Sequence, residues 1–176
     1  MTNAYEIFKQ SIIEAKDLLE CFITLNSHSE LTAPDALKKA SLILALTAWE
    51  TYVEDVITEI FNVKFSMVKG SRLGSFAEKQ LKERLKQFHN PGSRKTKQLF
   101  EEFFDFDVTA KWIWNNVDSE TARKQLNKWI SLRGDAVHRV NVDPTAPHII
   151  KKDELAKCIR FIEELVKATD QAVINL

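Results

Sequence analysis

The sequence is poor in glycine and proline, with four residues of each among its 176. Folds built from many short strands need such residues at frequent turns, so their scarcity excludes that class and favours a few long helices. Strand-like alternation, internal repeats and low-complexity segments are also missing. With 44% hydrophobic residues at this length, the chain is expected to form one domain, residues 1–176, with room for a proper core.

Net charge is absent as well, because 25 basic residues balance 25 acidic ones. A strongly basic chain would indicate permanent nucleic-acid binding, and this composition does not. No apolar run approaches the ~20 residues that span a bilayer, and no signal-peptide pattern opens the sequence. The two cysteines, Cys21 and Cys158, fall in helical segments without a CxxC motif. We expect them to be reduced packing residues in a cytoplasmic protein without a membrane partner.

Several familiar site motifs are missing. The sequence contains no P-loop, no GxGxxG after a strand, no GxSxG and no HExxH. Its four histidines show no metal-ligand spacing with cysteines or paired acids, and no acidic cluster of metal-binding type is present. We therefore expect no metal and no cofactor, and hydrolysis by two metal ions is disfavoured.

Apolar residues do recur at helical spacing in four long segments. These segments lie near residues 3–27, 34–69, 118–140 and 152–174. A break at residues 70–75 and a turn at residues 90–92 bound shorter helices in the middle, the second of them capped by Ser93. The sequence therefore predicts an all-α, up-and-down bundle of four long helices with short extra helices in the middle.

One arginine lies on the apolar face of the third long helix. At about 100° per residue, Arg133 falls on the line that Leu126, Ile130 and Val137 define. A guanidinium in that position costs free energy unless it is paired or faces a wet cleft. Arg133 is therefore a candidate functional residue.

Glu50 is a candidate partner for this arginine. It follows Trp49 in the apolar stripe of the second long helix, which puts it near the edge of the core. Glu50 and Glu54 are four residues apart on one face, so they are either an ordinary exposed carboxylate pair or a pair whose first member binds Arg133. We expect Glu50 to pair with Arg133 and to fix its orientation.

His138 follows Arg133 at five residues, which is about 140° around a straight helix. Gly134 lies between them and weakens the helix, so we expect a loosened last turn that brings the two side chains together. Arg84 and His89 have the same spacing, which shows that spacing alone is a weak signal. The wheel position of Arg133 and the glycine favour Arg133 and His138 as the functional pair.

Basic residues are concentrated in the middle of the chain, where residues 79–97 hold seven Lys or Arg and one acid. Such residues are either an ordinary solvated surface or a contact for phosphate groups, and two of them occupy the first turn of a predicted helix, where anions bind. The candidate RNA-binding residues are Lys82, Arg84, Lys86, Arg94, Lys95 and Lys97.

The pair of Arg133 and His138 is sufficient for one reaction without a metal. A histidine moves protons near neutral pH, and an arginine binds phosphate oxygens with two parallel hydrogen bonds. Together they suit the attack of a ribose 2′-hydroxyl on the adjacent phosphorus, with the histidine as acid or base. The reaction needs both an acid and a base, and one histidine is thin support for both roles. A symmetric dimer would supply a second histidine.

Residues 132–139, Leu-Arg-Gly-Asp-Ala-Val-His-Arg, resemble the Arg-x4–6-His signature of HEPN domains, most closely the RiboL-PSP-HEPN branch. The resemblance covers nearly the whole chain. It includes residues 48–55, 88–93, 99–100, 107–109 with Trp112, and 155–173. The residue after the signature arginine is often Asn, Asp or His in this family, whereas here it is Gly134, with Asp135 one position later.

This resemblance implies a helical bundle that dimerises and a metal-independent endoribonuclease of the toxin or phage-defence type. The catalytic residues would be Arg133 and His138, supported by Glu50, Asp135 and Arg139. The implied partners are RNA, a second copy of the chain, and an antitoxin or regulatory protein. The alternative is an inactive HEPN-like dimer that binds RNA, a nucleotide or a protein partner.

Overall fold

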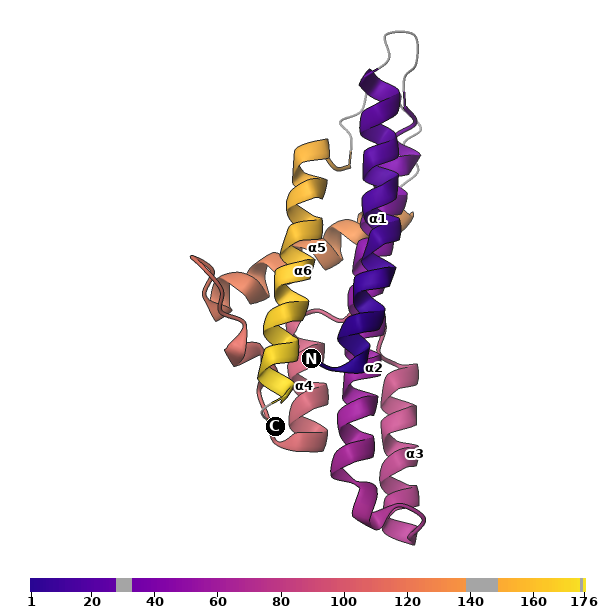
Figure 1. Cartoon of the computed structure of the whole chain (residues 1–176), viewed down its shortest axis with the longest axis vertical. Coiled ribbons are helices and arrows are strands. Elements are labelled where there is room, and N and C mark those ends of the chain that lie inside the picture. The colour runs from indigo at the N-terminus through magenta and orange to yellow at the C-terminus, as the bar shows by residue number, and fades with distance from the viewer. Residues whose placement is uncertain (28–32, 139–148, 175) are drawn as a thin grey trace.

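The computed structural model describes residues 1–27, 33–138, 149–174 and 176, which form six α-helices and two short 3₁₀ helices (Figure 1). The elements are α1 (Asn3–Ser27), α2 (Ala36–Lys64), η1 (Ser66–Val68), α3 (Arg72–Lys86), α4 (Ser93–Phe104), η2 (Val108–Lys111), α5 (Ser119–His138) and α6 (Lys152–Ile174). The predicted all-α class is confirmed for these residues. None of the described helices combines the length and the apolar character that a bilayer-spanning helix needs.

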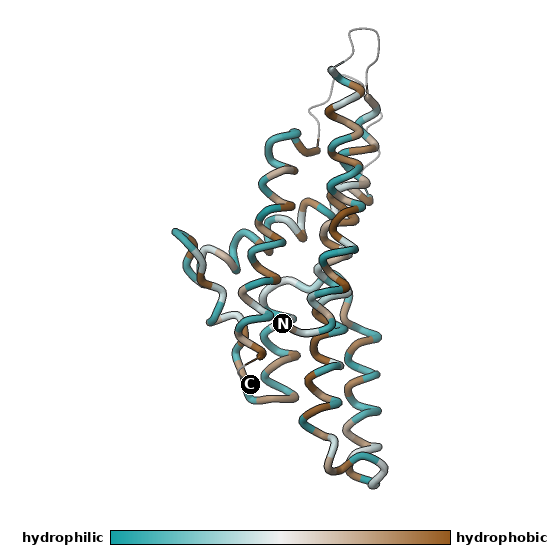
Figure 2. Tube along the Cα trace, in the orientation of Figure 1, coloured by the Kyte–Doolittle hydropathy of each residue, from teal (hydrophilic) through white to brown (hydrophobic). Residues whose placement is uncertain are grey.

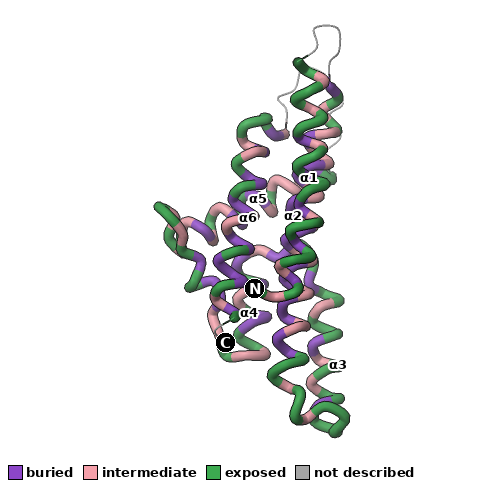
Figure 3. The backbone as a smooth tube through the Cα atoms, in the orientation of Figure 1, coloured by how far each residue is buried: buried purple, intermediate pink, exposed green. Residues whose placement is uncertain are grey.

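Helix α2 is at the centre of the packing. It contacts α1 along much of its length and also packs against α4, α5 and α6. Figure 1 shows α5 crossing behind α6 at a steep angle rather than running alongside it. Apolar residues recur along α2 in Figure 2, and Figure 3 shows buried positions along the same helix and along α6. Because α2 contacts several other helices, a polar side chain on α2 can bind groups from more than one of them.

The heptad spacing read from the sequence is confirmed in α2 and α6. The spaced residues of α2 are all buried: Leu42, Leu46, Trp49, Val53, Val56 and Ile60. Those of α6 are buried too: Leu155, Ile159, Ile162, Val166, Thr169 and Val173. The periodicity predicted these faces because burial at every third or fourth residue is what makes a helix amphipathic.

The break between α2 and α3 lies earlier in the chain than predicted. Helix α2 ends at Lys64, and α3 begins at Arg72 instead of after residue 75. Ser71 causes the early start, because its hydroxyl accepts a hydrogen bond from the backbone N–H of Gly74 at 3.1 Å. Gly74 is required in this first turn, since a Cβ atom there would lie 2.1 Å from the carbonyl oxygen of Val68.

The two cysteines do not share one environment. Cys158 is buried as predicted, and burial raises the pKa of its thiol to about 12. Cys21 is exposed, so its prediction as a packing residue is wrong. It lies two residues beyond buried Leu19, about 200° around α1 and therefore away from the core.

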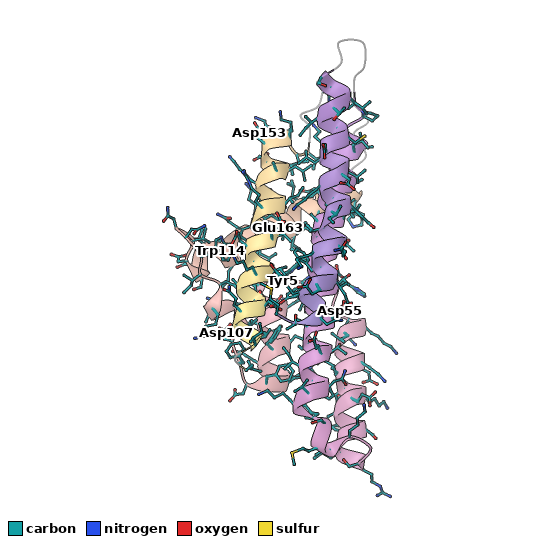
Figure 4. All side chains as sticks on the ribbon, viewed as in Figure 1. Tyr5, Asp55, Asp107, Trp114, Asp153 and Glu163 are labelled. Carbon is teal, nitrogen blue, oxygen red and sulfur yellow. The ribbon has the colours of Figure 1, made fainter. Side chains whose placement is uncertain are left out.

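Asp107 joins η2 to α4 and α5 (Figure 4). One carboxylate oxygen accepts hydrogen bonds from the backbone N–H and the hydroxyl of Thr109, at 3.0 and 2.6 Å. The other accepts one from Lys97 at 2.7 Å and lies 3.8 Å from Arg123. Burial alone would raise the pKa of Asp107, but the hydrogen bonds from Lys97 and Thr109 and the charges of Lys97 and Arg123 hold that pKa below its usual value.

We predict that Asp107→Ala lowers the free energy of unfolding by about 1 kcal/mol at pH 7, the usual cost of a lost helix cap. Because the carboxyl has a lower pKa folded than unfolded, its contribution is complete above the unfolded pKa and is lost as pH falls through the folded one. Urea unfolding of the two proteins should therefore converge in acid. Glu120→Ala, which removes an exposed carboxylate, is the control, and equal stability of the Asp107→Ala variant and the parent at pH 7 would contradict the prediction.

Candidate functional site

Arg133 of α5 forms the predicted ion pair with Glu50 of α2. Its Nη1 donates to Glu50 Oε2 at 2.7 Å, and its Nη2 donates to Thr47 Oγ1 at 3.3 Å. The side chains of Arg133 and Glu50 are 16% and 15% exposed, so this charged pair lies at the edge of the core. Its carboxylate and hydroxyl partners compensate for the water that the guanidinium loses.

The rest of α5 explains why Arg133 faces α2. The buried residues of this helix are Ala122, Leu126, Trp129 and Ala136. Arg133 lies on the same stripe, between Trp129 and Ala136 at spacings of four and three. Val137 was expected on this stripe but is 54% exposed, because the buried face passes through Ala136 in the last turn.

His138 does not converge with Arg133 within the chain. Helix α5 continues without interruption through Gly134 and has exposed His138 as its last residue. The loosening expected at Gly134 is therefore absent, and the two side chains leave the helix about 140° apart. Asp135 lies on nearly the opposite side of α5 from Arg133, and Arg139 lies outside the described residues.

A different histidine lies beside the ion pair. The Nδ1 atom of His89 is 3.7 Å from Glu50 Oε1, and its side chain is 74% exposed. Arg84 is not part of this arrangement, since its Nε donates to Glu102 at 2.8 Å on the exposed surface. The structure thus separates Arg84 from His89 and brings His89 to the carboxylate that Arg133 uses. Sequence reasoning missed this contact, which joins a loop to a helix 39 positions earlier.

The loop that carries His89 is fixed on both sides. Phe88 is 4% exposed, and the buried indole of Trp49 donates from Nε1 to the carbonyl oxygen of Pro91 at 2.9 Å. Asn90 between them has a φ of 51°, a left-handed conformation that asparagine tolerates better than most residues. Two buried neighbours and a tight turn therefore hold the backbone of His89 while its side chain faces solvent.

Helix α5 contacts the same loop through Asn127. Its Oδ1 accepts from the backbone N–H of Ser93 at 2.9 Å, and its Nδ2 donates to the Ser93 hydroxyl at 2.9 Å. A Cβ atom on Gly92 would lie 2.6 Å from Asn127 Oδ1, so only glycine permits this approach. Gly92 is the N-cap of α4, and the prediction that Ser93 caps this helix is wrong because its hydroxyl binds Asn127 instead.

The negative charges near the ion pair are carboxylates of α2. Burial and the charges of Glu50 and Asp55 raise the pKa of Glu54, while His89 lowers it. Two carboxylates, Glu50 and Glu54, therefore share this face of α2, with Arg133 as the cationic partner of Glu50 and the His89 imidazole nearby. In the part of the chain that the structure describes, His, Cys, Asp and Glu side chains form no group of three suited to a metal ion.

An open groove of about 420 Å³ lies next to these residues, lined by Asn90, Gly92, Arg94, Lys95, Asn127 and Ile130. The Nζ atom of Lys95 donates to the backbone carbonyl of His89. No described carboxylate forms an ion pair with Arg94 or Lys95. Their charges are therefore available to an anion in the groove.

The remaining predicted RNA-binding residues lie elsewhere. Lys82 pairs with Glu78 and Arg84 with Glu102, whereas Lys97 contacts both Glu101 and Asp107. Lys86 is exposed as the last residue of α3. Lys97 has a structural explanation in its contact with Asp107, and the groove leaves Arg94 and Lys95 as the best-placed members of the set.

The model of the RiboL-PSP-HEPN family matches residues 9–175. The chain belongs to this family. The matched range of this HEPN domain includes Glu50, His89, Arg133 and His138, together with every helix that positions them. No curated protein and no solved structure matches the chain.

We predict strong energetic coupling between Glu50 and Arg133. Glu50→Gln should lower the free energy of unfolding by up to about 3 kcal/mol, because it leaves a largely buried guanidinium without its counter-charge. In an Arg133→Met background the same change should cost at least about 1 kcal/mol less. Urea unfolding of the four proteins measures the cycle, and additive effects would contradict the predicted pair.

Proposed function

We propose that this RiboL-PSP-HEPN domain is a metal-independent endoribonuclease of the toxin or phage-defence type. The observation that carries the proposal is the Arg133 guanidinium, which Glu50 and Thr47 hold on α5. Ile130, three residues earlier on the same helix, lines a groove with two basic side chains, Arg94 and Lys95. Family membership supports an action on RNA but does not by itself specify the reaction.

Arg133 can bind a phosphate without leaving Glu50. A guanidinium has five N–H donors, of which the contacts with Glu50 and Thr47 use two. The remaining donors suit the oxygens of a phosphodiester, and they stabilise the negative charge that builds up on phosphorus during attack. Fixing the guanidinium in advance avoids the cost of ordering it when the substrate binds.

The reaction proposed is an internal transfer at phosphorus. The ribose 2′-oxygen loses its proton and attacks, the P–O5′ bond breaks, and the 5′-oxygen takes a proton. The products are a 2′,3′-cyclic phosphate and a 5′-hydroxyl. His138 is the proposed proton-transfer residue at the leaving oxygen, Arg94 and Lys95 bind the RNA backbone, and Asp135 and Arg139 support the site.

A dimer is part of this proposal. His138 is exposed on a different side of α5 from Arg133, so one chain does not direct both at one phosphate. Val137 next to it is apolar and 54% exposed, as expected for a residue that a second copy covers. A two-fold dimer joined at this end of α5 would bring His138 of the partner subunit toward the groove.

We predict that the purified protein cleaves total RNA in the presence of EDTA. His138→Ala should reduce the rate by about 10²–10⁴-fold, the usual contribution of general acid–base catalysis. Arg133→Lys should also fail, because a point charge does not reproduce the planar donor set. End-group analysis should find the cyclic phosphate.

Three results would contradict the mechanism. They are loss of cleavage in EDTA, equal cleavage of DNA, which lacks the attacking 2′-hydroxyl, and full activity of both variants. RNA binding without cleavage would support the inactive HEPN-like dimer instead. Binding that falls steeply with salt, and less steeply in Arg94→Ala, would test the groove separately.

We predict a homodimer in solution. Sedimentation equilibrium at micromolar concentration should give twice the 20.3 kDa of one chain. Val137→Lys should shift the protein toward monomer, because it places charges at the proposed contact. The matched control is Ile113→Lys, another apolar residue, 64% exposed, on the connection before α5. A monomeric parent protein would count against the arrangement.

A further inference from the structure

The Glu50 carboxylate has two oxygens, and each faces a different functional group. Oε2 accepts a hydrogen bond from Arg133 at 2.7 Å, and Oε1 lies 3.7 Å from Nδ1 of His89. The carboxylate is only 15% exposed, whereas the imidazole is 74% exposed. One largely buried acid thus connects a proposed phosphate-binding group to an accessible histidine.

We propose that His89 is a second catalytic residue, the general base that takes the proton from the attacking 2′-hydroxyl. This inference rests on the proposed endoribonuclease function and names a group for it that Arg133 and His138 do not supply. A carboxylate at Nδ1 keeps the proton on that nitrogen and orients the ring, which leaves Nε2 to exchange a proton with a substrate.

Three features favour a functional imidazole over an ordinary surface histidine. The backbone on either side is fixed, by buried Phe88 and by the Trp49–Pro91 hydrogen bond. The side chain is not packed, so it is free to reach a ligand. His89 is also adjacent to the groove, since the next residue, Asn90, lines that groove and Lys95, which also lines it, binds the carbonyl of His89.

The distance of 3.7 Å exceeds that of a hydrogen bond, and this is compatible with the role. Contacts in a catalytic site are often long without substrate and shorten when it binds. The charged groups around the ring are Glu50 and Glu54 of α2, Arg133 of α5 beyond Glu50, and Lys95 of α4 on the carbonyl side. The two carboxylates lie nearest, so a positive imidazolium formed during the reaction is stabilised there.

The step balances with the groups that the proposal names. Neutral Nε2 of His89 receives the 2′-hydroxyl proton as the O2′–P bond forms. The P–O5′ bond then breaks, and the 5′-oxygen takes a proton from His138. One proton enters the protein and one leaves, so no outside reactant is needed once the two histidines exchange protons with water.

His89→Ala in the full chain tests the proposal, with Gln87→Ala as the matched control on the same exposed turn. RNA cleavage in EDTA should fall by about 10²–10⁴-fold for His89→Ala and remain at the parent level for the control. The pH–rate profile should lose its acidic limb, since that limb reports the base. Added imidazole should restore part of the rate, and thermal unfolding should match that of the parent protein.

A second substrate separates the base from the acid. A nucleoside 3′-(4-nitrophenyl phosphate) has a leaving group that needs no proton. His138→Ala should recover most of its rate on this substrate, and His89→Ala should not.

The outcomes separate this inference from the proposed function. If the parent protein cleaves RNA and His89→Ala retains its rate and pH profile, His89 is not a base and the endoribonuclease proposal stands. Loss of activity without imidazole rescue, with an unchanged pH profile, would also overturn the role of His89, because a structural defect explains it. A parent protein that does not cleave RNA overturns both proposals.

Discussion

The ion pair between Glu50 and Arg133 is the constraint on which the candidate site depends. Both charges are largely withdrawn from water, so the pair contributes little net stability compared with apolar residues of the same volume. Its effect is geometric instead. Removing either partner leaves a largely buried charge without its counter-charge, so the pair reinforces the orientation of α5 that its buried stripe sets. The steep crossing of α5 is compatible with this contact, which needs only one turn of the helix.

Two adjacent residues of α2, Trp49 and Glu50, position the loop that carries His89 and the arginine of α5. Trp49 lies in the core, against Tyr52 and Trp112, and its indole binds Pro91 in the loop before α4. Glu50, the next residue, binds Arg133 and faces His89. One turn of a buried helix thus positions two elements that are distant in sequence. Groups held from a rigid helix keep their mutual geometry better than groups held only by loops.

The spacing of apolar residues in the sequence predicted which faces of the helices are buried. The apolar stripes of α2 and α6 gave their buried faces, and Arg133 on an apolar line required a partner that proved to be Glu50. The predictions failed where a tertiary contact decides the outcome. Ser93 could have capped α4 by its type, but Asn127 binds its hydroxyl. His89 lies near Glu50 in a loop that contacts with the core, such as the Trp49–Pro91 hydrogen bond, hold in place. Neither contact can be predicted from the spacing of residues within one segment, because each joins segments that are distant in the sequence.

The two signature residues of α5 lie on different sides of the helix, and the proposed reaction depends on this arrangement. Arg133 points to Glu50 and Thr47 of α2, whereas His138 and exposed Val137 occupy the last turn on other sides. On the straight helix α5, the two signature side chains leave the axis about 140° apart. In the proposed reaction, one chain supplies Arg133 for the phosphate and His89 as the base, and His138 of the partner subunit supplies the acid. Under this proposal a monomer lacks the acid for the leaving 5′-oxygen, so the cleavage rate should depend on the concentration of the chain.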